Sequence, residues 1–331
     1  CWLSVLRMLL AVILTPCLVL NGAPPLRRGA LLRAPVAMAS APASEALDSD
    51  AAALLKEAGG DVGRAQTSYI GYTLAYIEEE QPELYEALKT DPLRPECHEV
   101  LVEVTWDAIA AFLPVTHSPT PTPAAAKKLT AIARAVCDGS VEAPAVLDVG
   151  CGNGLLQPFL TACGAPPAAY LGIDLSSRMV QVAEATHGES GATFEAVSFD
   201  AVAAEAGEPP AGRRFDAIVF NGSLQFFADQ TAALAKAAGL LAPGPSSRIV
   251  LSHLSGAAFV RKEAEENPNT VRSVMPELTQ LEASAAGLGL QVVIPSFYGT
   301  EIESISEGLE DFYLVMLRWD AAHGGSDGME A

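Results

Sequence analysis

The stretch from Val146 to Gly154 constrains the fold of this chain more than any other. It reads Val-Leu-Asp-Val-Gly-Cys-Gly-Asn-Gly, so a short apolar run broken by one acid is followed by glycine at alternate positions. The apolar run predicts the end of a buried strand, and the glycines predict a tight turn directly after it. Bare backbone at Gly150, Gly152 and Gly154 allows a ligand to lie against main-chain N–H groups.

The spacing of these glycines indicates the kind of ligand. A dinucleotide-binding turn has its third glycine three residues after the second, so that a helix N-terminus holds the pyrophosphate. Here Gly152 and Gly154 are two residues apart. The turn therefore predicts a site for an adenosine-sized ligand, and no pyrophosphate is implied.

A second apolar run, Tyr170 to Ile173, ends on the carboxylate of Asp174, twenty residues after Gly154. In doubly wound sheets an acid at this position binds the ribose of a nucleotide. Asp174 can accept hydrogen bonds from both ribose hydroxyls, and hydrogen bonds to charged groups contribute roughly 1.5–3 kcal/mol each.

Four segments together resemble, in order and spacing, the successive motifs of class I S-adenosylmethionine-dependent methyltransferases. One glycine-rich turn is common in proteins, whereas four motifs in this order are specific. The similarity covers about Val141 to Trp319. The alternative is a Rossmann-like domain that holds no cofactor. The four segments are Asp148-Val-Gly-Cys-Gly-Asn-Gly154, Gly172-Ile-Asp-Leu-Ser176, Phe199-Asp-Ala201 and Phe215-Asp-Ala-Ile-Val-Phe-Asn221.

The expected fold class is α/β, a Rossmann-like doubly wound seven-stranded sheet with an N-terminal helical cap. Alternating strand and helix patterns predict a largely parallel sheet, and the resemblance adds an antiparallel last strand. Residues 301–311 are expected to be an acidic loop, and residues 321–331 a disordered tail. Strands are expected near Val146, Tyr170, Thr193, Phe215, Ile249, Val292 and Tyr313.

The resemblance also implies S-adenosyl-L-methionine as the cofactor and assigns its contacts. Asp148 and the glycine turn resemble the wall beside the methionine part, and Asp174 resembles the ribose clamp. Leu175 and Met179 resemble the adenine side, although a methionine at helical spacing fills core gaps equally well. The full set of expected contacts is Asp148, Gly150, Cys151, Gly152, Asn153, Gly154, Asp174, Leu175, Met179, Asp200, Ala201, Asn221 and Gly222.

Other members of this set have alternatives of their own. Asp200 and Ala201 resemble the adenine-edge contact. Asn221 and Gly222 are expected beside the methionine tail or the acceptor, or they mark a turn. Cys151 is better explained as a small residue in a crowded turn than as a reactive thiol.

The acceptor is not determined by these motifs. Methyl transfer from a sulfonium is an in-line displacement, so holding the acceptor and methyl roughly 3–3.5 Å apart can supply much of the catalysis. The fourth motif has no Asn-Pro-Pro-Tyr or Asp-Pro-Pro-Tyr, and the only Pro-Cys pair is Pro16-Cys17, which argues against DNA methylation. We expect a small-molecule methyl acceptor. The alternatives are a protein acceptor and a cofactor-binding pseudoenzyme that serves as a partner subunit.

His253 is the candidate catalytic residue. It follows the apolar run Ile249 to Leu251, which places it at the carboxyl end of the fifth strand, beside the acceptor. Its imidazole is suited to take a proton near neutral pH. The alternative is that it bonds backbone and fixes a loop.

Composition excludes several classes of partner. A formal net charge of −20 repels a phosphate backbone, and no basic stripe offsets it, so nucleic acid is not expected as a partner. Six cysteines without a Cys-x-x-Cys pair, and no His-x-x-x-His, indicate neither a metal site nor a disulfide framework.

Residues 1–44 are expected to be a targeting presequence, because they hold four arginines and no acid. The apolar run from Met8 to Leu20 has the length of a signal-peptide core and is too interrupted to span a bilayer, so no stable membrane insertion is expected of the mature protein. The following stretch has the composition of a transit peptide, and together they resemble the two-part presequences of algae with secondary plastids. Secretion, a mitochondrial address and cytosolic initiation at Met38 remain alternatives. Because the chain begins at Cys1, further residues are expected before it.

Residues 45–123 are expected to form the helical cap and a proline-rich connector, and residues 124–320 the methyltransferase domain. Asp50 is the expected N-cap of the first helix, and a second helix is expected from Asp61 to Glu80. The helix expected from Glu96 to Leu113 is apolar on two faces and needs cover on two sides. Its Trp106 either packs in the core or contacts substrate. Pro114 to Pro123 is expected to be extended.

Overall fold

The computed structural model describes residues 47–118, 120–205, 214–295 and 305–320. The predicted presequence of residues 1–44, with its localisation, and the predicted tail of residues 321–331 lie outside the described residues. Within the described ranges, no helix is both long enough and apolar enough to cross a membrane.

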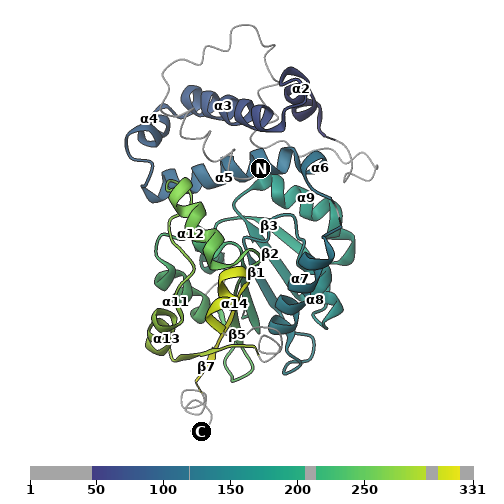
Figure 1. The fold of residues 1–331 in the computed structure, drawn as a ribbon, viewed down its shortest axis with the longest axis vertical. Helices are drawn as coiled ribbons and strands as arrows, with labels where there is room; N and C mark the ends of the chain where they lie inside the picture. Colours follow the sequence, from purple (N-terminus) through teal and green to yellow (C-terminus); the bar gives the residue numbers. More distant parts are fainter. Residues whose placement is uncertain (1–46, 119, 206–213, 296–304, 321–331) are drawn as a thin grey trace.

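A seven-stranded sheet forms the centre of the molecule (Figure 1). Its order is β3-β2-β1-β4-β5-β7-β6; the first five strands are parallel, and β7 runs antiparallel to both of its neighbours. This confirms the predicted Rossmann-like sheet with a reversed last strand. The strands are β1 (Val146–Val149), β2 (Tyr170–Asp174), β3 (Thr193–Ala196), β4 (Ala217–Asn221), β5 (Arg248–His253), β6 (Leu290–Val293) and β7 (Tyr313–Trp319).

Helices cover both faces of the sheet, with α7 and α8 on one side and α11 and α13 on the other (Figure 1). The central strands β1 and β5 are buried along their whole length, which explains their continuous apolar sequences. The elements after the cap are α7 (Pro123–Cys137), α8 (Gln157–Ala162), η1 (Pro167–Ala169), α9 (Ser177–His187), η2 (Gly188–Ser190), α10 (Phe199–Glu205), η3 (Leu224–Phe226), α11 (Gln230–Leu240), α12 (Gly256–Glu266), α13 (Leu278–Gly287) and α14 (Ile305–Asp311).

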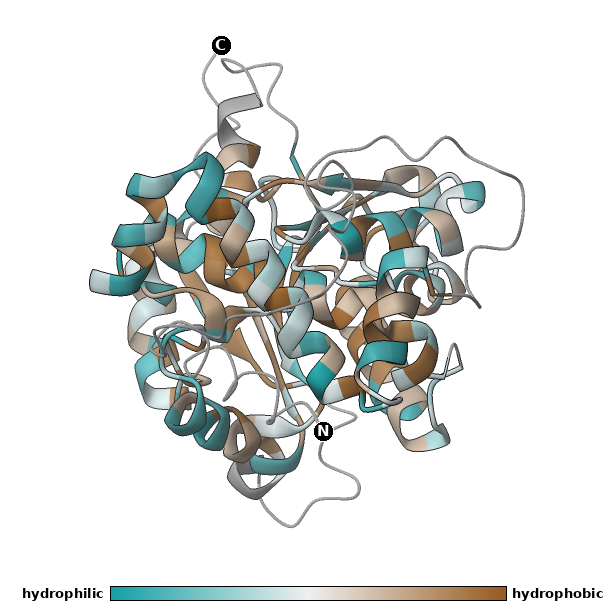
Figure 2. Cartoon of the chain, turned by 90° about the horizontal axis from the view of Figure 1, so that it is seen from above, coloured by the Kyte–Doolittle hydropathy of each residue, from teal (hydrophilic) through white to brown (hydrophobic). Residues whose placement is uncertain are grey.

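The cap is a separate layer of helices above the carboxyl ends of the strands (Figure 1). The view from above shows apolar residues where helices meet and hydrophilic residues on outward faces (Figure 2). The predicted second helix is confirmed, since Asp61 caps its start and Glu80 ends it. The cap elements are α2 (Ser49–Glu57), α3 (Val62–Glu80), α4 (Pro82–Thr90), α5 (Pro95–Ala111) and α6 (Leu113–Thr116).

Helix α5 joins the cap to the sheet domain through its two apolar faces, as its sequence predicts. One face, with Cys97, Leu101, Val104 and Ala108, belongs to the hydrophobic core of the cap. The other face brings Ile109, with Trp106, against Met179 of α9, together with Leu113 of α6. The helix therefore forms the boundary between cap and sheet domain.

A polar contact holds the same boundary. Asp107 of α5 is 3% exposed and accepts a hydrogen bond of 2.6 Å from Ser176 Oγ. Arg178 of α9 pairs with Asp48 of the cap, and its guanidinium lies over the ring of Tyr69, 5.2 Å from the ring centroid. The cap is thus bonded as well as packed to α9.

Two expectations in the cap were wrong. Asp48, not Asp50, caps α2, because its carboxylate accepts from the backbone N–H groups of Asp50 and Ala51. The predicted extended connector from Pro114 begins as a helix instead, since α6 runs from Leu113 to Thr116. Proline is compatible with the first turn of a helix, where its missing N–H has no intrahelical partner.

The prediction of an acidic loop over residues 301–311 was also wrong for the described part of this segment, which forms α14. Leu309 is buried, and Glu310 pairs with Arg261 of α12. A Cβ atom on Gly256, at the start of α12, would lie 2.0 Å from the carbonyl oxygen of Glu310. Close packing against α12 therefore accounts for helix in a segment whose charge suggested a loop.

Candidate cofactor and acceptor site

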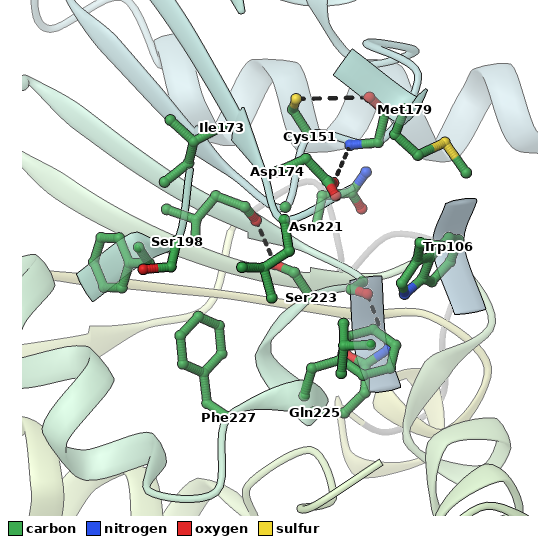
Figure 3. A pocket seen from close by; sticks show the side chains of 18 of the residues that line it. Trp106, Cys151, Ile173, Asp174, Met179, Ser198, Asn221, Ser223, Gln225 and Phe227 are labelled. Atoms are coloured by element: carbon green, nitrogen blue, oxygen red, sulfur yellow. Dashed lines mark hydrogen bonds between the residues drawn. The ribbon is translucent and has the colours of Figure 1, made fainter. Parts of the chain in front are cut away.

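A cavity of about 820 Å³ lies between the carboxyl ends of the parallel strands and helix α5. This is the edge at which open α/β sheets bind ligands. Figure 3 shows side chains of the sheet domain on one side and Trp106 of α5 on another. The predicted residues that line the cavity are Gly150, Cys151, Gly152, Asn153, Asp174, Leu175, Met179, Asp200, Asn221, Gly222 and His253.

The glycine turn after β1 approaches its neighbours closely. The backbone N–H groups of Gly150 and Cys151 both donate to the carbonyl of Ile173, at 2.8 and 2.9 Å. Gly150 has a φ of 72°, and a Cβ there would lie 2.5 Å from Cβ of Ser223. A Cβ on Gly152 would meet no atom within 4 Å, so this glycine leaves space at the cavity wall. The turn therefore fits a ligand lying against its backbone.

Asp174 ends β2 with both carboxylate oxygens bonded to backbone. Oδ2 accepts from Gly152 N at 2.8 Å (Figure 3), and Oδ1 accepts from Ser176 N at 2.9 Å. Burial raises the pKa of this carboxyl to about 6, while the two N–H bonds act in the opposite direction. Each oxygen retains a lone pair, so the carboxylate is oriented and still able to accept from two hydroxyls.

Three expected contacts do not line the cavity: Asp148, Gly154 and Ala201. Gly154 packs inward, because a Cβ there would lie 2.8 Å from His187 and 3.1 Å from Phe194. Ala201 lies in α10, and its neighbour Asp200 reaches the cavity with a largely exposed side chain paired to Lys236.

Asp148 is buried beneath the turn. It is 1% exposed, and its Oδ2 accepts a hydrogen bond of 2.9 Å from the hydroxyl of Tyr170. Its Oδ1 has no hydrogen-bond partner among the described residues. Burial raises the pKa of Asp148 to about 7, against a smaller lowering by the Tyr170 bond. The side chain is therefore protonated over much of the acidic range in the folded protein.

This shift predicts a pH dependence of stability. Between about pH 4 and pH 7, folded Asp148 keeps a proton that the unfolded chain releases, so the free energy of unfolding falls as pH rises, by up to about 1.4 kcal/mol per pH unit. Asp148→Asn removes this titration and is expected to flatten the slope. Tyr170→Phe removes the bond that favours the charged form, so the slope should extend to higher pH. Urea unfolding of the ligand-free protein across this range measures both, and equal slopes in all three proteins would contradict the assignment.

Met179 packs in the core, as one of its two expectations has it, and the adenine contact stays a prediction. It is 3% exposed, it packs with Ile109 of α5, and it also lines the cavity. Cys151 is 8% exposed, and burial raises the pKa of its thiol, which disfavours a reactive thiolate. Among the described residues, no group of three His, Cys, Asp or Glu side chains is placed to hold a metal ion.

Asn221 and Gly222, at the end of β4, form a bonded corner of the cavity. Ser252 donates from its hydroxyl to Asn221 Oδ1 at 3.1 Å, and Gly222 N donates to the carbonyl of Ser252 at 2.8 Å. Gly222 has a φ of 72°, which fits its expected role in a turn. Asn221 and Gly222 therefore form a turn and line the cavity at the same time.

An aromatic wall follows this corner, which the sequence motifs did not indicate. Phe199 and Phe220 meet edge to face at 5.6 Å, and Phe227 contacts both rings. Across the cavity, Trp106 of α5 meets Phe226 edge to face at 5.8 Å. The pair Phe226-Phe227, which begins five residues after Asn221 at the end of the fourth motif, was the available sequence signal. The cavity therefore combines a polar end at Asp174 with an aromatic region under the cap.

His253 reaches the cavity from the end of β5, but its geometry does not fit the general base that we expected. Its Nδ1 accepts a hydrogen bond of 3.2 Å from Ser255 N, so the neutral ring carries its proton on Nε2. The ring is 8% exposed and stacks on Phe259. Burial, with Lys128 nearby, lowers the pKa of His253 to about 4. A neutral donor that fixes a loop is the better description.

Comparison with known proteins agrees with the fold and the motifs. A family model described as a methyltransferase domain matches residues 147–245. A ubiquinone biosynthesis O-methyltransferase of Xanthomonas axonopodis pv. citri is 37% identical over 116 residues, which are 34% of this chain and 45% of that relative. Its counterpart in Chromobacterium violaceum is 28% identical over 193 residues, covering 54% of this chain and 80% of that protein. The match thus spans less than half of the Xanthomonas relative's length.

A solved structure is similar at lower identity. Magnesium protoporphyrin IX methyltransferase from Synechocystis PCC 6803, with bound S-adenosylmethionine, is 16% identical, with a TM-score of 0.44, covering 67% of this chain and 97% of that chain. The domain match begins in β1 and extends past α11, so it contains all four motifs that carry the resemblance. Residues 147–245 thus match a methyltransferase domain, and the motifs and the strand order resemble those of class I methyltransferases, whose cofactor is S-adenosylmethionine.

Proposed function

We propose that this protein transfers a methyl group from S-adenosylmethionine to a hydroxyl group of a small, largely apolar molecule. The observation that carries the proposal is the cavity itself. Its polar end at Asp174 and the glycine turn suits a nucleoside, and its aromatic end under α5 suits a second, apolar molecule. Volumes of this size are typical of small-molecule sites.

The protein's own residues act by position and by exclusion of water. The cofactor would supply a methyl group bound to a positively charged sulfur, which makes the methyl carbon open to attack by an electron pair. Asp174 orients the ribose, and the backbone at Gly152 gives the ligand close approach. Trp106 and the aromatic wall exclude water, and they hold the acceptor in line with the methyl group.

The relatives support a hydroxyl acceptor, because both curated proteins are named as O-methyltransferases. The cap supports a small molecule over a protein chain. Residues of α5 that line the cavity, among them Val102 and Trp106, lie over the region that an extended peptide would need to enter.

The test is incubation of the full chain with cofactor labelled on its methyl carbon and a cell extract separated into small-molecule and protein fractions. We expect label in an organic-soluble metabolite. Label in protein would instead support the protein methyltransferase. Cofactor binding without label in either fraction would support the non-catalytic partner subunit.

A further inference from the structure

Two buried oxygen atoms in the cavity wall have no hydrogen-bond partner among the described residues. They are Oε1 of Gln225, in η3, and Oε2 of Glu263, in α12. The two residues are 2% and 6% exposed, and both line the cavity. Buried acceptors without partners are unfavourable in folded proteins. A ligand that donates hydrogen bonds would satisfy both.

Hydrogen bonds fix the position of Gln225. Gln225 donates from Nε2 to the carbonyl of Gly222 at 2.9 Å (Figure 3). The amide nitrogen is therefore hydrogen-bonded, whereas the amide oxygen has no partner among the described residues. The backbone carbonyl of Gln225 accepts from Arg272 N and Ser273 N at 3.0 and 3.1 Å. The oxygen is therefore presented from a fixed backbone.

Glu263 is fixed by the end of its helix. Its backbone carbonyl accepts from Asn267 N at 2.9 Å, and the segment that follows is tied to the cap, because His98 Nε2 donates to the carbonyl of Thr270 at 2.8 Å. The opposite face of α12 carries Arg261, which pairs with Glu310. The carboxyl group of Glu263 thus lies on the cavity side of the helix.

Aromatic side chains lie near both residues. Trp106 and Phe226 form an edge-to-face pair, and Phe226 is the neighbour of Gln225. Phe259, one turn before Glu263 on α12, lies 5.5 Å from the ring of His253 and lines the same cavity. A molecule that satisfies the two oxygens would therefore bury an apolar body between aromatic rings.

We propose that Glu263 takes the proton of the hydroxyl group that is methylated, and that Gln225 accepts a hydrogen bond from a second donor on the same molecule. The substrate class is then an apolar molecule that carries two hydrogen-bond donors. This inference rests on the proposed function and assigns the acceptor side of that site. Glu263 replaces His253 as the base, since the lone pair of His253 is already bonded to Ser255 N.

The step balances within this site. The acceptor oxygen forms a bond to the methyl carbon with one of its electron pairs, and its O–H bond breaks. The proton goes to the carboxylate of Glu263, and the electrons of the former carbon–sulfur bond remain on sulfur, which loses its positive charge. The proton later leaves Glu263 to water when the product departs.

The electrostatic setting agrees with a proton acceptor. Burial raises the pKa of Glu263 to about 7, and Glu266 on the same helix raises it further. A base with a pKa near the working pH is effective in both taking and releasing a proton. The other titratable or charged residues that line the cavity are His98, Glu99, His117, Cys151, Asp174, Asp200, Asp229, His253 and Arg272.

The experiment uses the full chain and three probes of one shape: 4-butylcatechol with two donors, 4-butylphenol with one, and 4-butyl-1,2-dimethoxybenzene with none. We expect the wild type to methylate the catechol most efficiently and not to bind the dimethoxy compound. Glu263→Gln should lower kcat with the catechol by about 10²-fold or more. The matched control is Glu265→Gln, on the exposed side of α12, which should keep wild-type turnover.

Further readouts separate catalysis from structure. The wild-type kcat should rise with pH to a plateau above about pH 7, Glu263→Gln should lose this rise, and Glu263→Asp should restore part of the turnover. Gln225→Leu should raise KM for the catechol at least about fivefold and leave KM for the phenol within about twofold. Calorimetry with S-adenosylhomocysteine should give similar affinities for every variant.

The failures are distinguishable. A wild type that does not bind S-adenosylhomocysteine would overturn the proposed function. A wild type that binds it but methylates neither hydroxylated probe, or a Glu263→Gln variant with wild-type turnover and pH profile, would overturn the inference on Glu263 and Gln225.

Discussion

Replacing Asp174 with alanine is expected to weaken the binding of S-adenosylmethionine by about tenfold or more, because the ribose loses a charged hydrogen-bond acceptor. The loss has a second source in the turn. Asp174 also accepts from Gly152 N and Ser176 N, so its removal frees the backbone that faces the ligand. Calorimetric titration of the variant and the wild type measures the change.

Two controls separate these contributions. Asp174→Asn keeps the shape and one acceptor oxygen, and we expect its affinity to lie between those of the wild type and Asp174→Ala. Thermal unfolding without ligand shows whether the alanine variant is folded at the temperature of the titration. A folded Asp174→Ala protein with wild-type affinity would remove the main support for the ribose site.

Replacing Asp138 with alanine is expected to lower the free energy of unfolding by about 3–5 kcal/mol, because it removes the carboxylate that is paired with a buried guanidinium. Asp138 follows α7 and pairs with Arg248 of β5 and Arg318 of β7. Arg248 is 0% exposed, and burial lowers its pKa to about 10, so its charge is costly to leave unpaired. Urea unfolding monitored by fluorescence gives the change in stability.

The matched variant is the double replacement Asp138→Ala with Arg248→Met. It removes both charges, and we expect it to recover a large part of the lost stability, as buried ion pairs replaced by apolar residues often do. Arg248 begins β5, at the end of the strand opposite the cavity, so cofactor affinity should be unchanged in folded protein. A loss below about 1 kcal/mol in the single variant would show that this pair is unimportant.

The sheet could be predicted from sequence because parallel strands buried on both faces appear as continuous apolar runs. The runs at Val146, Tyr170 and Ile249 each lie in an observed strand. The prediction near Phe215 was slightly early, since Phe215 forms an isolated bridge with Leu241 and β4 begins at Ala217. The local hydropathy pattern was sufficient to predict these strands because each of them is buried along nearly its whole length.

The acceptor side of the cavity could not be predicted in the same way. Glu263 stands in a charged run, Arg-Lys-Glu-Ala-Glu-Glu, which is typical of an exposed helix, yet it is buried on the cavity side of α12. The direction of the His253 imidazole depends on a bond to Ser255 N that no sequence pattern indicates. Both facts arise from contacts between elements far apart in the chain.

The direction of the Asp148 side chain, on the cofactor side, could not be predicted from the sequence either. The motif places it beside the glycine turn, but strands alternate their faces, and its side chain points to Tyr170 beneath the sheet edge. Its neighbours in the motif reach the cavity through backbone, which the glycines could reveal. Only the structure shows which side chains reach the cavity.

The most direct test of the central claim is a calorimetric titration of the full chain with S-adenosylhomocysteine, followed by the same titration in the presence of excess NAD. The glycine spacing and the bonded carboxylate of Asp174 predict one site per chain, a dissociation constant in the micromolar range or below, and poor competition by NAD. Displacement of S-adenosylhomocysteine by NAD, or binding of NAD alone, would contradict the account.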